Sequence, residues 1–122
     1  MGKLNFALIG AGRIGRVHAQ NLSWRIPEVN LLAVMDSSLE AAERCATDFQ
    51  IPSFGSNLNE ILDDRSIDVV VICSATPSHP NLIIKAAKAG KHIFCEKPIA
   101  LALNQVDEAM SIVCEQRVKF QV

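Results

Sequence analysis

The sequence predicts an α/β protein built on a doubly wound parallel sheet. Short apolar runs alternate along the chain with segments of helical period, which favours strands joined by helices. The run DVVVICS (residues 68–74) has no polar alternation, as expected for a strand that is covered on both faces. A glycine-rich stretch, GAGRIG (residues 10–15), separates the first apolar run from the first helical segment. Parallel pairing with right-handed crossovers then gives the strand order 3-2-1-4-5-6.

The first two predicted strands are residues 4–10 and residues 30–36. The helix between them has a predicted apolar face that consists of Ile14, Val17 and Leu22. A second helix follows residue 38, with Ser37 or Ser38 as its cap and an apolar face of Leu39, Ala42, Ala46 and Phe49. A short third strand is predicted at residues 51–54.

The rest of the chain continues this alternation. Asn57 and Glu60 have the spacing of a capping box and predict a brief helix through residue 62. The strand at residues 68–74 precedes a helix at residues 80–89, which Gly90 ends. After a strand at residues 92–96, Asn104 is the predicted cap of a helix whose apolar stripe is Val106, Ala109, Met110 and Val113. Residues 118–122 form the last predicted strand.

Composition excludes several classes of protein. The chain has 122 residues, the size of one domain, with 49% hydrophobic and 20% charged residues, which argues against disorder. Twelve Lys and Arg nearly balance 13 Asp and Glu, so no nucleic acid partner is predicted. Because no signal peptide or membrane span is apparent, we expect a cytoplasmic protein. No CxxC pair or histidine cluster at ligand spacing occurs, so we predict no metal site and reduced, mostly buried cysteines.

The stretch GAGRIG matches the GxGxxG pattern, and its position between a strand and a helix is the one that the pattern requires. Gly10 would allow the tight turn, Gly12 would let a pyrophosphate approach the backbone, and Gly15 would let the helix pack against the strand. The start of the helix would offer free N–H groups to phosphates. These features predict a Rossmann domain that binds a dinucleotide.

Asp36 lies 21 residues after Gly15, at the end of the second predicted strand, where a carboxylate would accept hydrogen bonds from the adenosine ribose. A carboxylate also repels the 2′-phosphate of NADP, and serines rather than an arginine follow Asp36. NAD is therefore the expected cofactor and NADP the less favoured one. Arg13, in the phosphate loop, leaves open a contact with an additional phosphate.

Two further strand ends are expected at the same edge of the sheet. CSATPSHP (residues 73–80) leaves the central strand across the switch point, so Ser74, Ala75 and Thr76 would pass the nicotinamide ribose. His79 would either contact that ribose or simply pack at the start of the helix. The fourth segment, CEKP (residues 95–98), ends the fifth strand.

Taken together, these motifs resemble the Gfo/Idh/MocA family of nicotinamide-dependent oxidoreductases. The resemblance covers the whole chain and rests on ALIGAGRIGRVHAQNL, AVMD and ICSATPSHPNLIIKAAKAGKHIFCEKPIAL, with EKP as its most specific element. CSATPSH and FCEKPI are most similar to the inositol 2-dehydrogenase branch. The resemblance implies transfer of hydride between a secondary alcohol of a sugar or inositol and the nicotinamide.

The resemblance also implies roles for the EKP segment. A lysine at the position of Lys97 reaches the reacting hydroxyl, Glu96 lies near the cofactor ribose and Pro98 sets the turn. Partial burial and a neighbouring oxidised nicotinamide would both disfavour the charge of this lysine and so favour acid–base behaviour. Lys97 is thus the one catalytic candidate. The candidate cofactor-binding residues are Gly10, Gly12, Arg13, Ile14, Gly15, Asp36, Ser74, Ala75, Thr76, His79, Glu96, Lys97 and Pro98.

Family members carry a second α/β domain that supplies a histidine, an acid, most sugar contacts and the oligomer interface. We therefore expect residues 1–122 to be the cofactor domain of a longer homo-oligomeric enzyme, nearly inactive alone and with exposed apolar surface. Two other hypotheses remain. A non-catalytic dinucleotide-sensing module would use the glycine loop and Asp36 but not CEKP, and a methyltransferase that binds S-adenosylmethionine would leave both CEKP and the six-strand pattern unexplained.

Overall fold

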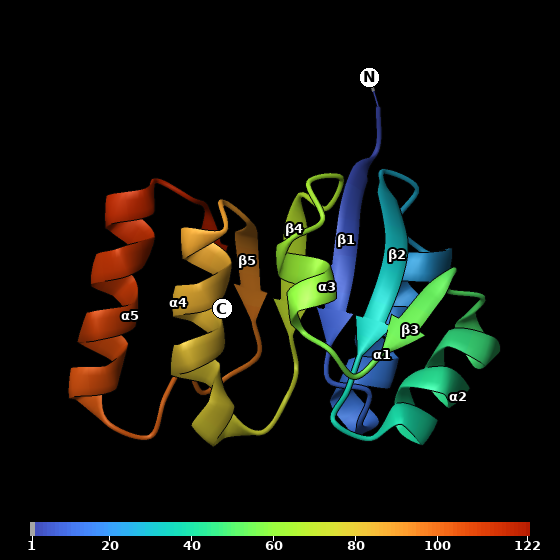
Figure 1. Cartoon of the computed structure of the whole chain (residues 1–122), viewed down its shortest axis with the longest axis horizontal. Coiled ribbons are helices and arrows are strands. Elements are labelled where there is room, and N and C mark those ends of the chain that lie inside the picture. The colour runs from blue at the N-terminus through green and yellow to red at the C-terminus, as the bar shows by residue number, and fades with distance from the viewer. Residues whose placement is uncertain (1) are drawn as a thin grey trace.

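The computed structural model describes residues 2–122 and contains one six-stranded sheet with the order β3-β2-β1-β4-β5-β6 (Figure 1). Every pair of neighbouring strands is parallel. The strands are β1 (Leu4–Ile9), β2 (Val29–Met35), β3 (Ser53–Gly55), β4 (Val69–Ile72), β5 (His92–Cys95) and β6 (Phe120–Gln121). The predicted fold class and strand order are confirmed.

The helices form a layer on each face of the sheet. They are α1 (Arg13–Trp24), α2 (Leu39–Phe49), α3 (Asn59–Leu62), α4 (His79–Lys88) and α5 (Leu103–Gln116), with a short 3₁₀ turn, η1 (Thr76–Ser78), before α4. Helices α1 and α2 cover one face, while α3, α4 and α5 cover the other (Figure 1). The strand order runs from β1 to β3 in one direction and from β1 to β6 in the other, so right-handed crossovers place helices on both faces.

Strand β4 shows how both layers are filled. All four of its residues are buried. Val70 and Ile72 belong to the core under α3, α4 and α5, whereas Val71 belongs to the core under α1 and α2. Because successive side chains of a strand point to opposite faces, a strand between two helical layers must be apolar throughout. The uninterrupted run VVVI therefore marks the middle of the sheet.

The predicted apolar face of α1 is only partly right. Leu22 is buried, but Ile14 and Val17 are 42% and 48% exposed, and the inner face of α1 consists of Gly15, Ala19 and Leu22. Small side chains let a helix approach the sheet closely, so the buried stripe of this helix is not its most hydrophobic one. A search for large apolar residues selects the wrong side of such a helix.

Helix ends differ from expectation in two places. Asn104 was expected to cap α5, but the helix starts at Leu103 and Ala102 is the capping residue, so Asn104 lies inside the first turn. Asn57 and Glu60 were expected to form a capping box, but Leu58 is the capping residue of α3 and no side chain caps this helix, although Asn57 accepts a hydrogen bond from the Asn59 N–H at 3.0 Å. Ser38 is the serine that caps α2, with its hydroxyl accepting from the Ala41 N–H at 3.2 Å.

Lys91 is a buried charged residue at the start of β5, only 4% exposed. Its ammonium donates to the carbonyls of Asp64 and Ile67, at 2.5 and 2.9 Å. These bonds close the loop between α3 and β4 at the amino edge of the sheet, and they satisfy a charge that burial would otherwise make costly.

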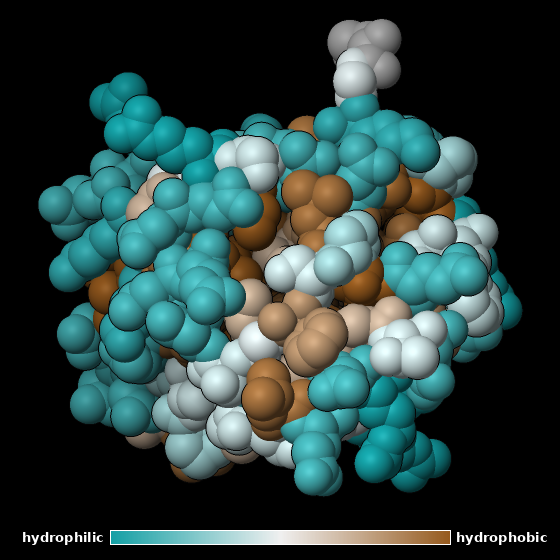
Figure 2. Space-filling model, turned by 45° about the vertical axis from the view of Figure 1, so that its right-hand side comes forward, coloured by the Kyte–Doolittle hydropathy of each residue, from teal (hydrophilic) through white to brown (hydrophobic). Residues whose placement is uncertain are grey.

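The surface still carries sizeable apolar side chains, as expected. Figure 2 shows apolar residues gathered in the middle of one face, with hydrophilic residues around them. The most exposed large hydrophobic residues are Leu101 and Leu103, at 71% and 80%. No helix within residues 2–122 has the length and apolar character needed to cross a membrane.

Candidate functional site

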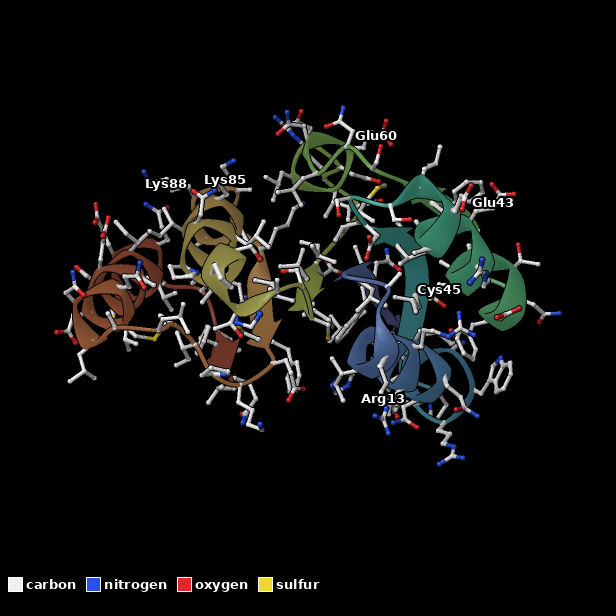
Figure 3. The ribbon with its side chains drawn as sticks, turned by 90° about the horizontal axis from the view of Figure 1, so that it is seen from below. Arg13, Glu43, Cys45, Glu60, Lys85 and Lys88 are labelled. Atoms are coloured by element: carbon white, nitrogen blue, oxygen red, sulfur yellow. The ribbon has the colours of Figure 1, made fainter. Side chains whose placement is uncertain are left out.

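Four segments meet at the carboxyl edge of the sheet, the edge that faces the viewer in Figure 3. The strand register places Ile9 beside both Met35 and Ile72, and Ile72 beside Cys95. The residues that follow these four strand ends therefore lie in a row along one edge. This convergence was predicted from the sequence.

Two glycines of the GAGRIG turn are required by packing within the chain. Gly10 has φ +104°, and a Cβ atom there would lie 2.5 Å from the carbonyl carbon of Cys73. A Cβ atom on Gly15 would lie 2.0 Å from the Gly10 carbonyl oxygen. Gly12 differs, because a Cβ atom there would meet nothing within 4 Å. The space above Gly12 is open to a ligand.

Helix α1 begins directly at this open space. No side chain caps its first turn, and no acidic residue lies in that turn. The first N–H groups of a helix have no partner within the helix, and together with the helix dipole they favour an anion. Arg13 and Ile14 are both exposed here, and Figure 3 shows Arg13 at the start of the helix.

Asp36 joins the end of β2 to the glycine turn. Its Oδ2 accepts from the Ala11 N–H at 2.7 Å, and its Oδ1 accepts from the Ser38 N–H at 2.8 Å. Each carboxylate oxygen has a further lone pair, so the half-buried carboxylate keeps capacity for a ligand hydroxyl. Asp36 is thus fixed in orientation before any ligand arrives.

A small cavity of about 160 Å³ lies beside Asp36. Its lining residues are Ile9, Met35, Asp36, Ser37, Ser56, Leu58 and Leu82. Among these, Ser56, Leu58 and Leu82 were not predicted from the sequence. Ser56 and Leu58 lie in the loop before α3 and Leu82 lies in α4, so only the fold brings them to Asp36.

The hydroxyls after β4 form a short chain. The hydroxyl of Ser78 donates to the Ala75 carbonyl at 2.6 Å. Ser78 was not predicted from the sequence either. The Ser74 hydroxyl then donates to the Ser78 oxygen, 2.7 Å away, because the Ser78 proton is already used. Ser74 consequently presents lone pairs, while Ala75 is exposed and Thr76 half-buried.

The EKP segment follows β5 at the same edge. The Glu96 N–H donates to the Ile72 carbonyl at 2.9 Å, and the Lys97–Pro98 peptide bond is cis. Lys97 and Pro98 are exposed. The partial burial expected for Lys97 is absent from this chain, because the residues that it contains do not cover the lysine.

Two histidines contact this segment. His79 is 1% exposed, and its Nδ1 and Nε2 lie 2.7 Å from the Pro98 carbonyl oxygen and 2.8 Å from the Ser74 carbonyl oxygen. Of its two predicted roles, this geometry supports packing, since both ring nitrogens already have partners. His18, on α1, was missed from the sequence because its partner, Glu96, is 78 residues away.

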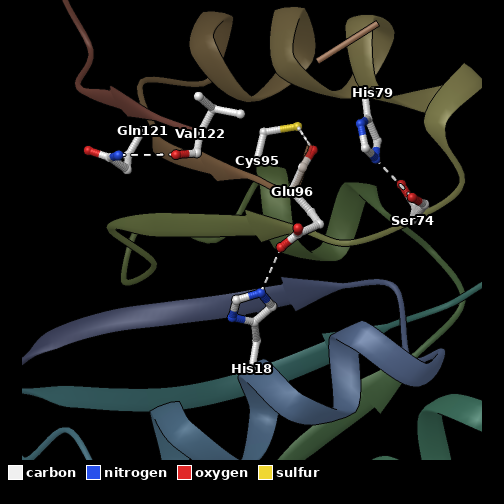
Figure 4. Close-up of polar contacts among 7 residues, drawn as sticks. All are labelled: His18, Ser74, His79, Cys95, Glu96, Gln121 and Val122. Carbon is white, nitrogen blue, oxygen red and sulfur yellow. Dashed lines mark hydrogen bonds and ion pairs between the residues drawn. The ribbon is translucent and has the colours of Figure 1, made fainter. Parts of the chain in front are cut away.

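His18 also affects the charge of Glu96. Its Nε2 lies 2.9 Å from Oε2 of Glu96 (Figure 4), and its ring packs edge-on against Phe94 with centroids 5.3 Å apart. The hydrogen bond from His18 is the main cause that lowers the pKa of Glu96, and the Lys97 N–H and the charge of Lys97 add to it. Glu96 is therefore ionised near neutral pH.

The cysteines near this edge are not nucleophiles. Burial, and secondarily the Glu96 carboxylate, raises the pKa of both Cys73 and Cys95 to about 12. Both stay thiols near neutral pH, as expected for small buried side chains. Residues 2–122 also contain no group of three or more His, Cys, Asp or Glu side chains that could hold a metal ion.

Comparison with known proteins agrees with this geometry. The family model GFO_IDH_MocA, described as an oxidoreductase family with an NAD-binding Rossmann fold, matches residues 4–122. The chain is 42% identical over 115 residues to an uncharacterized oxidoreductase of Bacillus subtilis, covering 94% of this chain and 33% of the relative. It is 40% identical over 116 residues to the scyllo-inositol 2-dehydrogenase (NAD(+)) of the same organism, covering 95% and 34%.

A solved structure extends the likeness to three dimensions. The scyllo-inositol dehydrogenase of Lactobacillus casei, solved with bound NAD(H) and scyllo-inositol, has a TM-score of 0.91 at 26% identity, covering 98% of this chain and 35% of that one. The chain thus spans about one third of the length of these relatives. Because the family model matches residues 4–122, nearly the whole chain, the chain belongs to the Gfo/Idh/MocA oxidoreductase family with an NAD-binding Rossmann fold.

Proposed function

We propose that this chain is the cofactor domain of a dehydrogenase that moves hydride between a secondary alcohol of an inositol or sugar and NAD. The observation that carries the proposal is the position of Lys97, which lies in the same row of strand ends as the glycine turn and Asp36. A primary amine beside a dinucleotide site can accept the proton of an alcohol. The names of the relatives, which include scyllo-inositol 2-dehydrogenase, support inositol as the substrate class.

The residues at the edge fit a dinucleotide in three places. The open space at Gly12 and the uncapped start of α1 suit the pyrophosphate, with Arg13, Ile14 and the remaining glycines around it. Asp36 suits the adenosine ribose, and the apolar cavity beside it suits the adenine ring. When bound, NAD⁺ supplies the hydride acceptor at nicotinamide C4.

The nicotinamide half would lie beside Ser74, Ala75 and Thr76. The lone pairs of the Ser74 hydroxyl can accept from a ribose hydroxyl. Glu96 lies one strand further along, ionised and held by His18.

NAD rather than NADP is the cofactor that we propose. The fixed carboxylate of Asp36 would repel a phosphate on the ribose, and Ser37 and Ser38 provide no cation next to it. Arg13 is the nearest candidate cation in the glycine turn, but it lies at the start of α1 rather than in the turn after β2.

Lys97 would act on the substrate hydroxyl. Its neutral amine would take the hydroxyl proton while hydride leaves the carbon that bears this hydroxyl for the bound NAD⁺, so that the alcohol becomes a ketone and Lys97 becomes an ammonium. Its exposed position in this chain leaves room for a substrate at that point. In the full-length enzyme that we propose, the remaining two thirds of the protein would cover Lys97 and add substrate contacts, further catalytic residues and a homo-oligomer interface. We propose a cytoplasmic location for this enzyme.

The test is turnover by the full-length enzyme with scyllo-inositol and myo-inositol as probes. Lys97→Ala is expected to lower kcat by roughly 100-fold or more, in the range of lost acid–base catalysis, and to leave NAD affinity within about threefold. Lys88→Ala, on the exposed side of α4, is the matched control and should retain full turnover. Unchanged turnover in Lys97→Ala would refute the assigned role.

The alternative is a dinucleotide-sensing module without catalysis. Titration calorimetry with NAD and NADP, followed by the polyol assay, separates the two. NAD binding without turnover by the full-length protein on any polyol would favour the sensing module. The identities to dehydrogenases favour the catalytic function.

A further inference from the structure

Lys97 is held through its neighbours rather than through its own side chain. No hydrogen bond or ion pair joins the Lys97 side chain to any of residues 2–122. The residue before it, Glu96, is bound by His18 of α1, and the residue after it, Pro98, is bound by His79 of α4. The two helices cover opposite faces of the sheet, so the contacts reach the turn from both sides.

His79 links two strand ends with one ring. Nδ1 lies 2.7 Å from the Pro98 carbonyl oxygen, beyond β5, and Nε2 lies 2.8 Å from the Ser74 carbonyl oxygen, beyond β4. Figure 4 shows the contact with Ser74. A carbonyl only accepts hydrogen bonds, so a neutral ring, with its single N–H, donates to one of the two carbonyls and packs against the other, whereas a protonated ring donates to both. The buried ring therefore fixes the distance between the segment after β4 that contains Ser74 and the segment after β5 that contains Lys97, here called the Lys97 turn.

His18 restrains the other side. Its ring is held by the edge-on contact with Phe94, and its Nε2 lies 2.9 Å from the Glu96 carboxylate, with both side chains 24% exposed. Because His18 lies in the helix that starts at the glycine turn, this contact ties the Lys97 turn to the proposed pyrophosphate site. His18 and His79 thus connect Lys97 to both halves of the proposed dinucleotide site.

We propose that His18 and His79 are positioning residues that set the place of Lys97 relative to the dinucleotide. This inference rests on the proposed function, since it gives the two histidines no role other than through Lys97. Misplacing a catalytic group by about 1 Å can cost roughly 100-fold in rate, so loss of either contact is expected to lower kcat more than it affects cofactor binding.

The variants His79→Asn and His79→Gln separate the two contacts of that ring. The amide nitrogen of Asn lies near the place of Nδ1 and can donate to Pro98, whereas that of Gln lies near the place of Nε2 and can donate to Ser74. In the full-length enzyme, His79→Asn is expected to retain at least threefold more kcat than His79→Gln, with the NAD dissociation constant of both within about threefold of wild type. Equal kcat in the two variants would overturn the role of the Pro98 contact.

The decisive measurement combines each histidine variant with Lys97→Ala. If the histidines act through Lys97, then His18→Ala and His79→Gln lower kcat about tenfold or more in the wild type and produce no further loss in Lys97→Ala. A structural role alone would lower kcat again in the double variants, and that result would overturn the inference. His18 is partly exposed, so its variants keep the inference testable if the buried His79 variants do not fold.

A third histidine provides the control. His92 is half-buried at the opposite edge of the sheet, where its Nδ1 accepts from the Lys119 N–H at 3.0 Å. His92→Asn should leave kcat unchanged. Full turnover in Lys97→Ala would refute the proposed function itself, whereas loss of turnover in Lys97→Ala with wild-type kcat in both histidine variants would refute only this inference.

Discussion

At the scale of single residues, hydrogen bonds within the chain already orient the side chains of the proposed site. Asp36 accepts two backbone N–H groups, the Ser74 hydroxyl donates to Ser78, and Glu96 is bound by His18. Such contacts hold side chains in place before a ligand binds, which reduces the ordering cost of binding. The motif residues were predictable because their types and spacing are specific. Ser78 and His18 were not, because each is defined by a partner that the fold supplies.

Asp36 should control both the affinity for NAD and the choice between NAD and NADP. Asp36→Asn removes a charged acceptor, and hydrogen bonds to charged groups contribute about 1.5–3 kcal/mol, so NAD affinity should fall roughly 10- to 100-fold. The affinity for NADP should fall less, because the variant also removes the repulsion between Asp36 and the 2′-phosphate. Titration calorimetry measures both constants, with Glu43→Gln on the outer side of α2 as the control (Figure 3). An unchanged NAD to NADP ratio would contradict the assignment.

The Glu96 carboxylate should contribute a stability that depends on pH. Its pKa is lowered in the folded chain, chiefly by His18, so the folded state favours the ionised form. This contribution is complete above the ordinary value of about 4.3 and is lost as the pH falls through the lower folded value. The difference in free energy of unfolding between wild type and Glu96→Gln should therefore shrink between pH 6 and pH 3. Urea unfolding at each pH measures it, and a constant difference would be the contrary result.

At the scale of helices and strands, the sequence predicted the elements well and their inner faces less well. The six strands follow from apolar runs with clear breaks, and β4 was identifiable as central because no polar residue interrupts it. Helix α1 was misread because its buried face depends on Gly15 and Ala19, whose small size matters more than their hydrophobicity. The predicted cap of α5 was displaced by two residues, because Asn104 is a common capping residue but Ala102 takes that position.

Helix α1 provides a prediction with a built-in control. Gly15→Ala places a Cβ atom 2.0 Å from the Gly10 carbonyl oxygen, so the helix must move and the free energy of unfolding should fall by about 1–3 kcal/mol. Gly12→Ala meets nothing within 4 Å and should keep wild-type stability while weakening NAD binding. Urea unfolding and calorimetry measure the two effects. Equal stability of both variants would show that close packing does not explain Gly15.

At the scale of the whole molecule, one sheet between two helical layers gives two cores that share the strands. The sequence predicted this arrangement because its strands contain too few polar residues for either face of the sheet to be exposed to water. The carboxyl edge was also predictable, since parallel strands place all their ends on one side. What lies opposite Lys97 was not predictable, because nothing within the described residues covers it.

The larger core can be tested at α4. Ile83 is fully buried, so Ile83→Ala should lower the free energy of unfolding by about 2–5 kcal/mol through lost burial and an unfilled cavity. Ile26→Ala removes the same atoms from a side chain that is 41% exposed, and it should change stability by about 0.5 kcal/mol or less. Denaturant unfolding followed by circular dichroism compares them. Similar losses in both variants would argue against the layer assignment.

The hydrogen-bonded hydroxyls after β4 help to determine where this edge presents donors and where it presents acceptors. Ser78 donates to the Ala75 carbonyl and Ser74 donates to Ser78, so both hydroxyl protons point into the protein. The start of α1, one strand away, instead presents N–H groups outward. A molecule laid along the edge therefore meets acceptors at Asp36, donors at the glycine turn and acceptors again at Ser74. A ligand that alternates hydroxyl, anion and hydroxyl in that sequence would match all three, so we expect the edge to favour a dinucleotide over a lone phosphate or a simple sugar.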